Sequence, residues 1–301
     1  MPTTIDRKGL ISFLGLAFGL AWLAVSPLWF SGQGLAFPMA VPLMTAMMFA
    51  PTVAALIVTR FISPPQGDTR DALGLRLGKG RHWGWYWVFA WLLIPLMNLV
   101  SPFVGALLGL LQLDLVNFSA YRALLAQAEA ISGPIPIAAS TLVLIQIAAA
   151  FTIAPILNAI PTLGEELGWR GYLLPQLLPL GQWPALLISG VIWGLWHAPV
   201  ILLGYNYPDH PVLGVLLMTG FCIIWGILFG WLRLATGSVW PAMIAHGALN
   251  GSAGITFLLL QAGTSYDSAL AGPTGMTSWI VPLLIIGLLV GLRRLPLGDP
   301  R

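Results

Sequence analysis

Long apolar stretches, separated by short polar segments, run along the whole chain. Stretches without a charged residue cover residues 9–59, 82–113, 130–164, 171–208, 234–266 and 268–292. Because a helix needs about 20 mostly apolar residues to cross a bilayer, each stretch can hold one or two spans. The pattern therefore predicts an all-α fold, a polytopic membrane helical bundle with about eight transmembrane helices at residues 9–31, 37–60, 82–110, 136–160, 183–204, 211–233, 238–262 and 276–293.

The positions of the basic residues predict how these helices are oriented. In multi-pass proteins, lysine and arginine collect in the cytoplasmic connections. If the N-terminus is cytoplasmic, only Arg122 falls on the outer side, and the following basic residues fall on the inner side: Arg7, Lys8, Arg60, Arg70, Arg76, Lys79, Arg81, Arg170, Arg233, Arg293, Arg294 and Arg301. This asymmetry predicts an even number of spans with N- and C-termini cytoplasmic, in the cell membrane.

Composition agrees with a membrane location and disfavours other classes of protein. Hydrophobic residues make up 58% of the chain and charged residues 8%, whereas a soluble domain has roughly a quarter charged. The pI of 9.3 reflects the loops of a membrane protein and gives no support to nucleic-acid binding. Cys222 is the single cysteine, so no intramolecular disulfide can form. The expected partner is the lipid bilayer, and no pattern sets an oligomeric state.

Glycines recur four residues apart within the predicted spans, a spacing that lets helices approach closely and predicts a compact bundle. The pairs are Gly15/Gly19, Gly105/Gly109, Gly190/Gly194, Gly226/Gly230, Gly247/Gly251 and Gly287/Gly291. Residues 1–301 are interpreted as a single integral membrane domain, with its motif-bearing core in about 136–262. In the predicted external loop at 111–133, the stretch YRALLAQAEAI can form a short amphipathic helix.

Two adjacent glutamates and an arginine follow an uncharged run of 35 residues, in the sequence TLGEELGWR. Glu166 and Arg170 are four residues apart and share a helix face, which favours an ion pair. Glu165 is rotated by about 100° and is left available. Low dielectric favours the neutral form of a carboxyl group, which suits a general base near neutral pH. The alternative is structural: Thr162 and Glu165 match a capping box, and Pro161 fits a chain break.

Two histidines lie inside predicted spans, where an ionisable residue is costly and therefore a candidate for function. His246 and Asn250 project from one helix face, so an imidazole and a carboxamide can both donate to one oxygen, as in an oxyanion hole. Trp193 and His197 repeat this spacing, and Pro199 is expected to kink the helix just after them. For either histidine the alternative is a packing role with a hydrogen bond to a carbonyl.

These residue types favour hydrolysis without a covalent intermediate, by a water held between a carboxylate and an imidazole. A serine or cysteine nucleophile is disfavoured, because neither stands beside a histidine in a motif and Cys222 has no such partner in sequence. No cofactor is expected. Zinc is a minor alternative, since two histidines and a glutamate can ligate it, although the H-E-x-x-H pattern is absent. A proton-coupled transporter could use the same buried groups as a relay.

Three motifs resemble, in the same order, those of the CAAX-protease and bacteriocin-processing (Abi) membrane proteins. EELGWR is similar to that family's E-E-x-x-x-R motif, WGLWH to its aromatic-x-x-x-H motif and HGALN to its H-x-x-x-N motif. The resemblance implies an intramembrane glutamic endopeptidase, of the type that removes the last three residues from prenylated CAAX proteins. The partner it implies is thus a peptide or lipidated-protein substrate. Family members linked to bacteriocin immunity or scaffolding supply a non-catalytic alternative.

Carried over by position, the resemblance gives each motif residue a role. It implies that Glu165 and His197 activate the water, while His246 and Asn250 stabilise the oxyanion. It implies a supporting role for Glu166 and Arg170. Trp193, which completes the second motif, is counted with these supporting residues.

The predicted spans leave Glu165 and His197 at different depths. Glu165 falls near the cytoplasmic end of its span, whereas His197 lies 14 residues into its own, or about 21 Å along a helix. For the two to meet, LGEELGWRGYLLPQLL is expected to be a partly buried helix rather than a cytoplasmic loop. The cavity that joins them is expected to be filled with water and open toward the cytoplasm.

Overall fold

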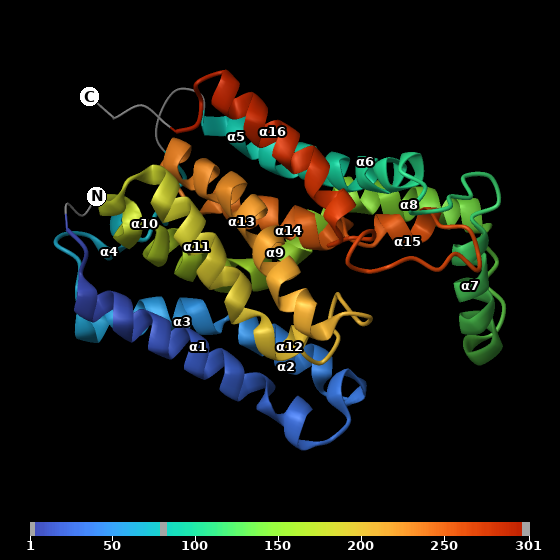
Figure 1. Cartoon of the computed structure of the whole chain (residues 1–301), viewed down its shortest axis with the longest axis horizontal. Coiled ribbons are helices and arrows are strands. Elements are labelled where there is room, and N and C mark those ends of the chain that lie inside the picture. The colour runs from blue at the N-terminus through green and yellow to red at the C-terminus, as the bar shows by residue number, and fades with distance from the viewer. Residues whose placement is uncertain (1–3, 79–82, 297–301) are drawn as a thin grey trace.

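The computed structural model describes residues 4–78 and 83–296, and every regular element within them is a helix (Figure 1). The predicted all-α fold is confirmed for these residues. Lys79, Arg81 and Arg301, which the orientation prediction uses, lie outside the described residues.

The α-helices form a bundle that is elongated along one axis. In chain order they are α1 (Arg7–Phe30), α2 (Ala40–Met48), α3 (Ala50–Ile57), α4 (Thr69–Ala72), α5 (Trp83–Val88), α6 (Ile94–Leu107), α7 (Ser119–Ser132), α8 (Ala139–Phe151), α9 (Ile153–Glu166), α10 (Leu174–Leu177), α11 (Gln182–Trp196), α12 (Ala198–Ile201), α13 (Pro211–Thr236), α14 (Trp240–Ser252), α15 (Ile255–Leu259) and α16 (Ile280–Gly291). Short 3-10 segments are η1 (Gly34–Ala36), η5 (Leu178–Leu180) and η6 (Met276–Trp279), and π-helical segments are η2 (Val58–Ile62), η3 (Phe89–Leu93) and η4 (Leu167–Leu173).

Several helices are long and apolar enough to cross a membrane, as a multi-pass membrane protein requires. Five described stretches qualify alone: Arg7–Phe30, Ala40–Ile62, Trp83–Leu107, Pro211–Thr236 and Trp240–Leu259. A sixth, Ala139–Phe151 with Ile153–Leu180, qualifies only as a pair bent by 50°. Helix α11, with 15 residues, and the stretch Met276–Gly291 are shorter. The count of eight spans and the cytoplasmic position of both termini therefore stay predictions. Helix α7 confirms the amphipathic helix expected between the third and fourth spans.

The predicted break near Pro161 is wrong, because α9 runs through Pro161 to Glu166 and helical structure continues to Leu180. The bend lies instead at Thr152, between α8 and α9. Thr162 is not an N-cap either: its hydroxyl donates to the carbonyl oxygens of Asn158 at 3.0 Å and Met243 at 3.1 Å. Away from water, a threonine inside a helix gives its proton to a nearby carbonyl.

The segment from Leu163 to Leu178 is a helix in the interior of the bundle. This position was expected, because Glu165 and His197 can meet only if the segment lies inside the membrane. All its residues from Gly164 to Pro175 are buried. The interpretation as a partly buried helix is confirmed, and the predicted span end at residue 160 is wrong.

Glycine packing brings the helices that carry the motifs close together. A Cβ added at Gly194 on α11 would lie 2.4 Å from the Cα of Thr219 on α13, and one at Gly247 on α14 would lie 2.5 Å from the carbonyl oxygen of Pro155 on α9. The close approach predicted from Gly190/Gly194 and Gly247/Gly251 is confirmed. It is wrong for Gly15/Gly19 and Gly287/Gly291, where an added Cβ would meet nothing within 4 Å.

Replacing Gly194 by alanine is expected to lower the free energy of unfolding by about 1–3 kcal/mol, because backbone must move to admit the methyl group. Gly287→Ala is the matched control, since it also adds one methyl group within a helix but into open space. Thermal unfolding in detergent compares the two. Equal stability of both variants would contradict the close packing of α11 on α13.

The two ends of the bundle differ in charge. One end, at the left of Figure 1, is where α1 begins and α16 ends; we call it the basic end. It holds Arg7, Lys8, Arg60, Arg70, Arg76, Arg233, Arg293 and Arg294, accompanied by Asp6, Asp68 and Asp71. The opposite end, which we call the acidic end, holds Asp114, Glu129, Asp209 and Asp267, together with Arg122 and His210.

Candidate active site

A cavity of about 920 Å³ reaches from the middle of the bundle to the acidic end. This volume is in the range of ligand pockets. Its inner part is lined by Glu165, Trp193, His197, His246 and Asn250. The structure therefore brings together all four residues predicted as catalytic and one of the three predicted as supporting.

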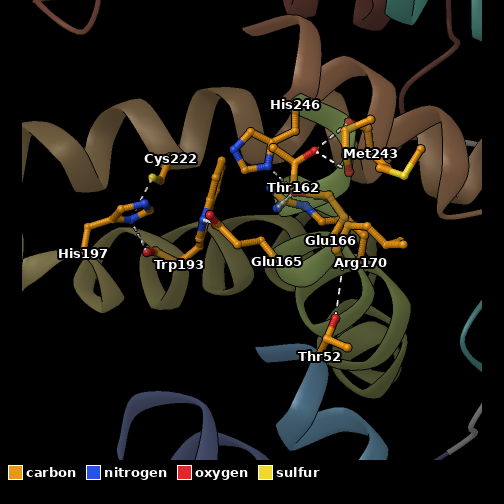
Figure 2. Close-up of polar contacts among 12 residues, drawn as sticks. Thr52, Thr162, Glu165, Glu166, Arg170, Trp193, His197, Cys222, Met243 and His246 are labelled. Carbon is orange, nitrogen blue, oxygen red and sulfur yellow. Dashed lines mark hydrogen bonds and ion pairs between the residues drawn. The ribbon is translucent and has the colours of Figure 1, made fainter. Parts of the chain in front are cut away.

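The two adjacent glutamates have different surroundings (Figure 2). Glu166 Oε1 accepts a hydrogen bond from Arg170 at 2.8 Å and lies 3.0 Å from His246 Nδ1. Glu165 Oε2 accepts from Trp193 Nε1 at 2.6 Å. Both carboxylates and the arginine are buried, but only Glu165 lines the cavity. The predicted ion pair between Glu166 and Arg170 is confirmed.

The indole of Trp193 contacts four ionisable groups of the site, Glu165, Arg170, His197 and His246. The guanidinium carbon of Arg170 lies 4.3 Å from its ring centroid, a cation–π arrangement. Its ring centroid is 5.8 Å from that of His197 and 5.2 Å from that of His246. With its Nε1 on Glu165, this one side chain sets the spacing of groups that come from α9, η4, α11 and α14.

His197 lies at the break between α11 and α12, two residues before Pro199, so the predicted interruption is present. Its Nδ1 lies 2.9 Å from the carbonyl oxygen of Trp193. Because a carbonyl only accepts, we assign the proton to Nδ1, which leaves Nε2 as the basic nitrogen. In His246, Nδ1 faces the Glu166 carboxylate, and Nε2 is again the nitrogen left for the cavity.

Three glycines let the helical segment that carries the glutamates lie close to α2, to α3 and to the residue that follows α4. Added Cβ atoms would lie 2.7 Å from the carbonyl oxygen of Met48 at Gly164 and 2.3 Å from the Cβ of Pro51 at Gly168. At Gly171 the distance to the carbonyl oxygen of Leu73 would be 2.9 Å. This contact was not predicted from the sequence, although the four-residue spacing of Gly164 and Gly168 is the signal for it. The π-helix η4, an element often found at functional sites, begins directly after Glu166.

Cys222 also lies at this site, with its Sγ 3.9 Å from His197 Nδ1 and its side chain on the cavity wall. Cys222 therefore has a histidine neighbour in space although it has none nearby in sequence, where 25 residues separate the two. The nitrogen nearest the thiol already donates to the Trp193 carbonyl, however, so it has no lone pair to accept the thiol proton. The geometry therefore disfavours this cysteine as a nucleophile.

Metal ligation was a minor alternative for the same residues. Among residues 4–78 and 83–296, no three His, Cys, Asp or Glu side chains are grouped as a metal ion would need. Glu165, His197 and His246 share a cavity without forming such a group. A chelator tests the zinc alternative directly.

The cavity opens at the acidic end. The predicted opening toward the cytoplasm and the predicted cytoplasmic position of the basic residues therefore cannot both hold. Its outer lining comes from α2 and from the connections that follow α1, α12 and α15, with Leu35, Val41, Tyr205, Asp209 and Thr274. Toward the basic end, the buried residues of η4 and the Glu166–Arg170 pair fill the interior.

Two comparisons relate the chain to known proteins. Residues 140–252 match the family described as type II CAAX prenyl endopeptidase, Rce1-like, and they include every predicted site residue. The chain is also similar to CAAX prenyl protease 2 from Methanococcus maripaludis, with 30% identity over 93 residues. That alignment covers 29% of this chain and 34% of the relative, so the chain spans about a third of the relative's length.

Fold and site together define a multi-pass helical membrane protein with a carboxylate and two imidazoles in a buried cavity. Residues 140–252 of the chain are thus similar to the CAAX-protease and bacteriocin-processing family.

Proposed function

We propose that the protein is an intramembrane glutamic endopeptidase, which hydrolyses a peptide bond in a CAAX-type C-terminus or a related membrane-associated polypeptide. The observation that carries the proposal is the cavity in which Glu165, His197, His246 and Asn250 meet. The family match and the name of the archaeal relative support the same class of reaction.

In the proposed reaction, a water molecule between Glu165 and His197 Nε2 attacks the carbonyl carbon of the substrate. The carboxylate takes a proton from the water as the new C–O bond forms, and the imidazole holds the water in place. When the tetrahedral intermediate collapses, the C–N bond breaks and the same proton passes to the leaving amine. The Trp193 N–H orients the general base, because it donates a hydrogen bond to one carboxylate oxygen of Glu165.

The oxyanion of the intermediate needs hydrogen-bond donors that are already in position. The Asn250 carboxamide is one, and His246 Nε2 is the other when the ring is an imidazolium. Glu166 orients this ring, since its carboxylate lies 3.0 Å from Nδ1. Its proposed role is thus to keep Nε2 turned toward the cavity.

Asn250→Ala is expected to lower kcat by about 10²–10³-fold, the usual loss for one oxyanion donor. Asn250 is exposed on the cavity wall, so its truncation should leave thermal stability unchanged. Asn158→Ala is the matched control: it lies on the same wall, but its side-chain nitrogen donates to the carbonyl oxygen of Ala154. A loss of the same size in both variants would count against a specific oxyanion role.

The purified protein can be tested on a panel of fluorogenic peptides, prenylated and unprenylated, with and without a chelator. We expect cleavage of at least one peptide, two products by mass spectrometry, and no effect of the chelator. Loss of cleavage on chelation would move the mechanism to zinc. Absence of cleavage by the folded protein across the panel would favour the immunity or scaffold alternative.

A further inference from the structure

The charge asymmetry of the bundle indicates which face of the membrane each end meets. Among the residues that the structure describes, eight arginine and lysine residues lie at the basic end, listed above, and Arg122 lies at the other. The imbalance between the two ends is of the kind that fixes orientation during insertion. By this rule the basic end is cytoplasmic and the acidic end is extracytoplasmic.

The cavity runs from the candidate active site to the acidic end. No residue from the basic-end connections at 63–78 or 234–239 lines it, and none from α10, η5 or the start of α11. Between the site and the basic end, Thr162 ties α9 to α14 through the Met243 carbonyl, and Arg233 Nε donates to the Arg170 carbonyl at 3.1 Å. These contacts, all among buried residues, close that route.

The opening at the acidic end is held in shape by contacts between the two connections that border it. The Tyr207 hydroxyl donates to the Thr274 carbonyl at 2.8 Å, and Ser268 Oγ donates to Asp209 at 2.9 Å. His210 Nε2 pairs with Asp267 at 2.9 Å. The α12–α13 and α15–α16 connections are therefore joined into one rim.

The wall between this rim and the site is mostly apolar and includes flexible side chains. It contains Val41, Met44, Met47, Met218, Phe221 and Phe257. Methionine side chains adapt to apolar groups of differing shape. Such a wall suits apolar side chains next to the bond that is cut.

We propose that substrate reaches the site from the extracytoplasmic face, as an apolar segment of an exported or membrane-anchored polypeptide. The proposal rests on the proposed peptidase function and specifies the substrate for it. A polypeptide held at the cytoplasmic leaflet would meet the closed basic end instead.

Labelling of single cysteines tests the route without relying on cleavage. In a Cys222→Ala background, Tyr205→Cys places a thiol on the cavity rim, where the native side chain is 40% exposed. Val116→Cys reports the acidic end outside the cavity, and Leu77→Cys reports the basic end; the native residues are 81% and 61% exposed. A membrane-impermeant maleimide is applied to spheroplasts, before and after permeabilisation, and thermal unfolding confirms that each variant is folded.

We expect Tyr205→Cys and Val116→Cys to react in intact spheroplasts, and Leu77→Cys to react only after permeabilisation. Protection of Tyr205→Cys until permeabilisation, whatever the other two sites do, would overturn the proposal. A protein without any peptidase activity would still give the expected labelling pattern. Failure of the proposed function and failure of this route are therefore distinguishable.

Discussion

Glu165→Gln is expected to lose cleavage by about 10²–10⁴-fold, the contribution of a positioned general base. Glutamine has the size of glutamate but cannot accept the proton of the attacking water. Its carbonyl oxygen can still accept the hydrogen bond from Trp193 Nε1, so the fold should change in stability by no more than about 1 kcal/mol. Rates on the best peptide of the panel and thermal unfolding in detergent measure the two effects.

The neighbouring residue provides a control for this variant. Glu166→Gln also removes one buried carboxylate, but from the ion pair with Arg170 and His246. We expect it to lower stability as well as cleavage, whereas Glu165→Gln lowers cleavage alone. If both variants lost stability to the same extent, a purely structural role for Glu165 would explain the data better.

Arg170→Ala is expected to lower the free energy of unfolding by about 3–5 kcal/mol, because it leaves the buried Glu166 carboxylate without its cation. The variant also removes the guanidinium from the faces of Trp193 and Phe229, at 4.3 Å and 5.3 Å from their ring centroids. Unfolding of the purified protein by heat or by denaturing detergent measures the loss.

Arg76→Ala is the matched control for this prediction. Arg76 pairs with Asp68 at 3.0 Å, but its side chain is 58% exposed, so the solvent-screened pair should contribute little to stability. A loss below about 1 kcal/mol for Arg170→Ala, similar to that of the control, would contradict the structural importance of the buried pair.

Contacts within a single helix could be predicted from the sequence. Glu166 with Arg170 and Trp193 with His197 are four residues apart, and both pairs meet in the structure. The all-helical fold followed equally directly, because apolar runs of this length have few other structures open to them in a membrane.

The contacts that assemble the site could not be predicted in this way. Glu166 and His246 are 80 residues apart, and Glu165 and Trp193 are 28 apart. Their pairing depends on which helices pack together. The glycines allow a close approach, but their positions in the sequence do not show which helix each of them will contact. The proximity of Cys222 to His197 was hidden for the same reason.

The boundaries of the fourth span failed because the local signals there are misleading. Pro161 is the expected breaker, yet the helix bends at Thr152, three residues before Pro155. Pro155 has no N–H to donate to the Phe151 carbonyl, which accepts from Trp91 Nε1 at 2.9 Å instead. Thr162 has the sequence context of a cap but satisfies carbonyl groups inside the bundle. In a membrane interior, the need to satisfy polar groups outweighs the local preference.

In the proposed reaction, a water activated by Glu165, and not a cysteine, attacks the substrate. The most direct test compares cleavage by Glu165→Gln and Cys222→Ala, each purified and shown to be folded. We predict that Cys222→Ala stays within about tenfold of the wild type, while Glu165→Gln loses about 10²-fold or more. Retained cleavage in Glu165→Gln together with its loss in Cys222→Ala would contradict the account.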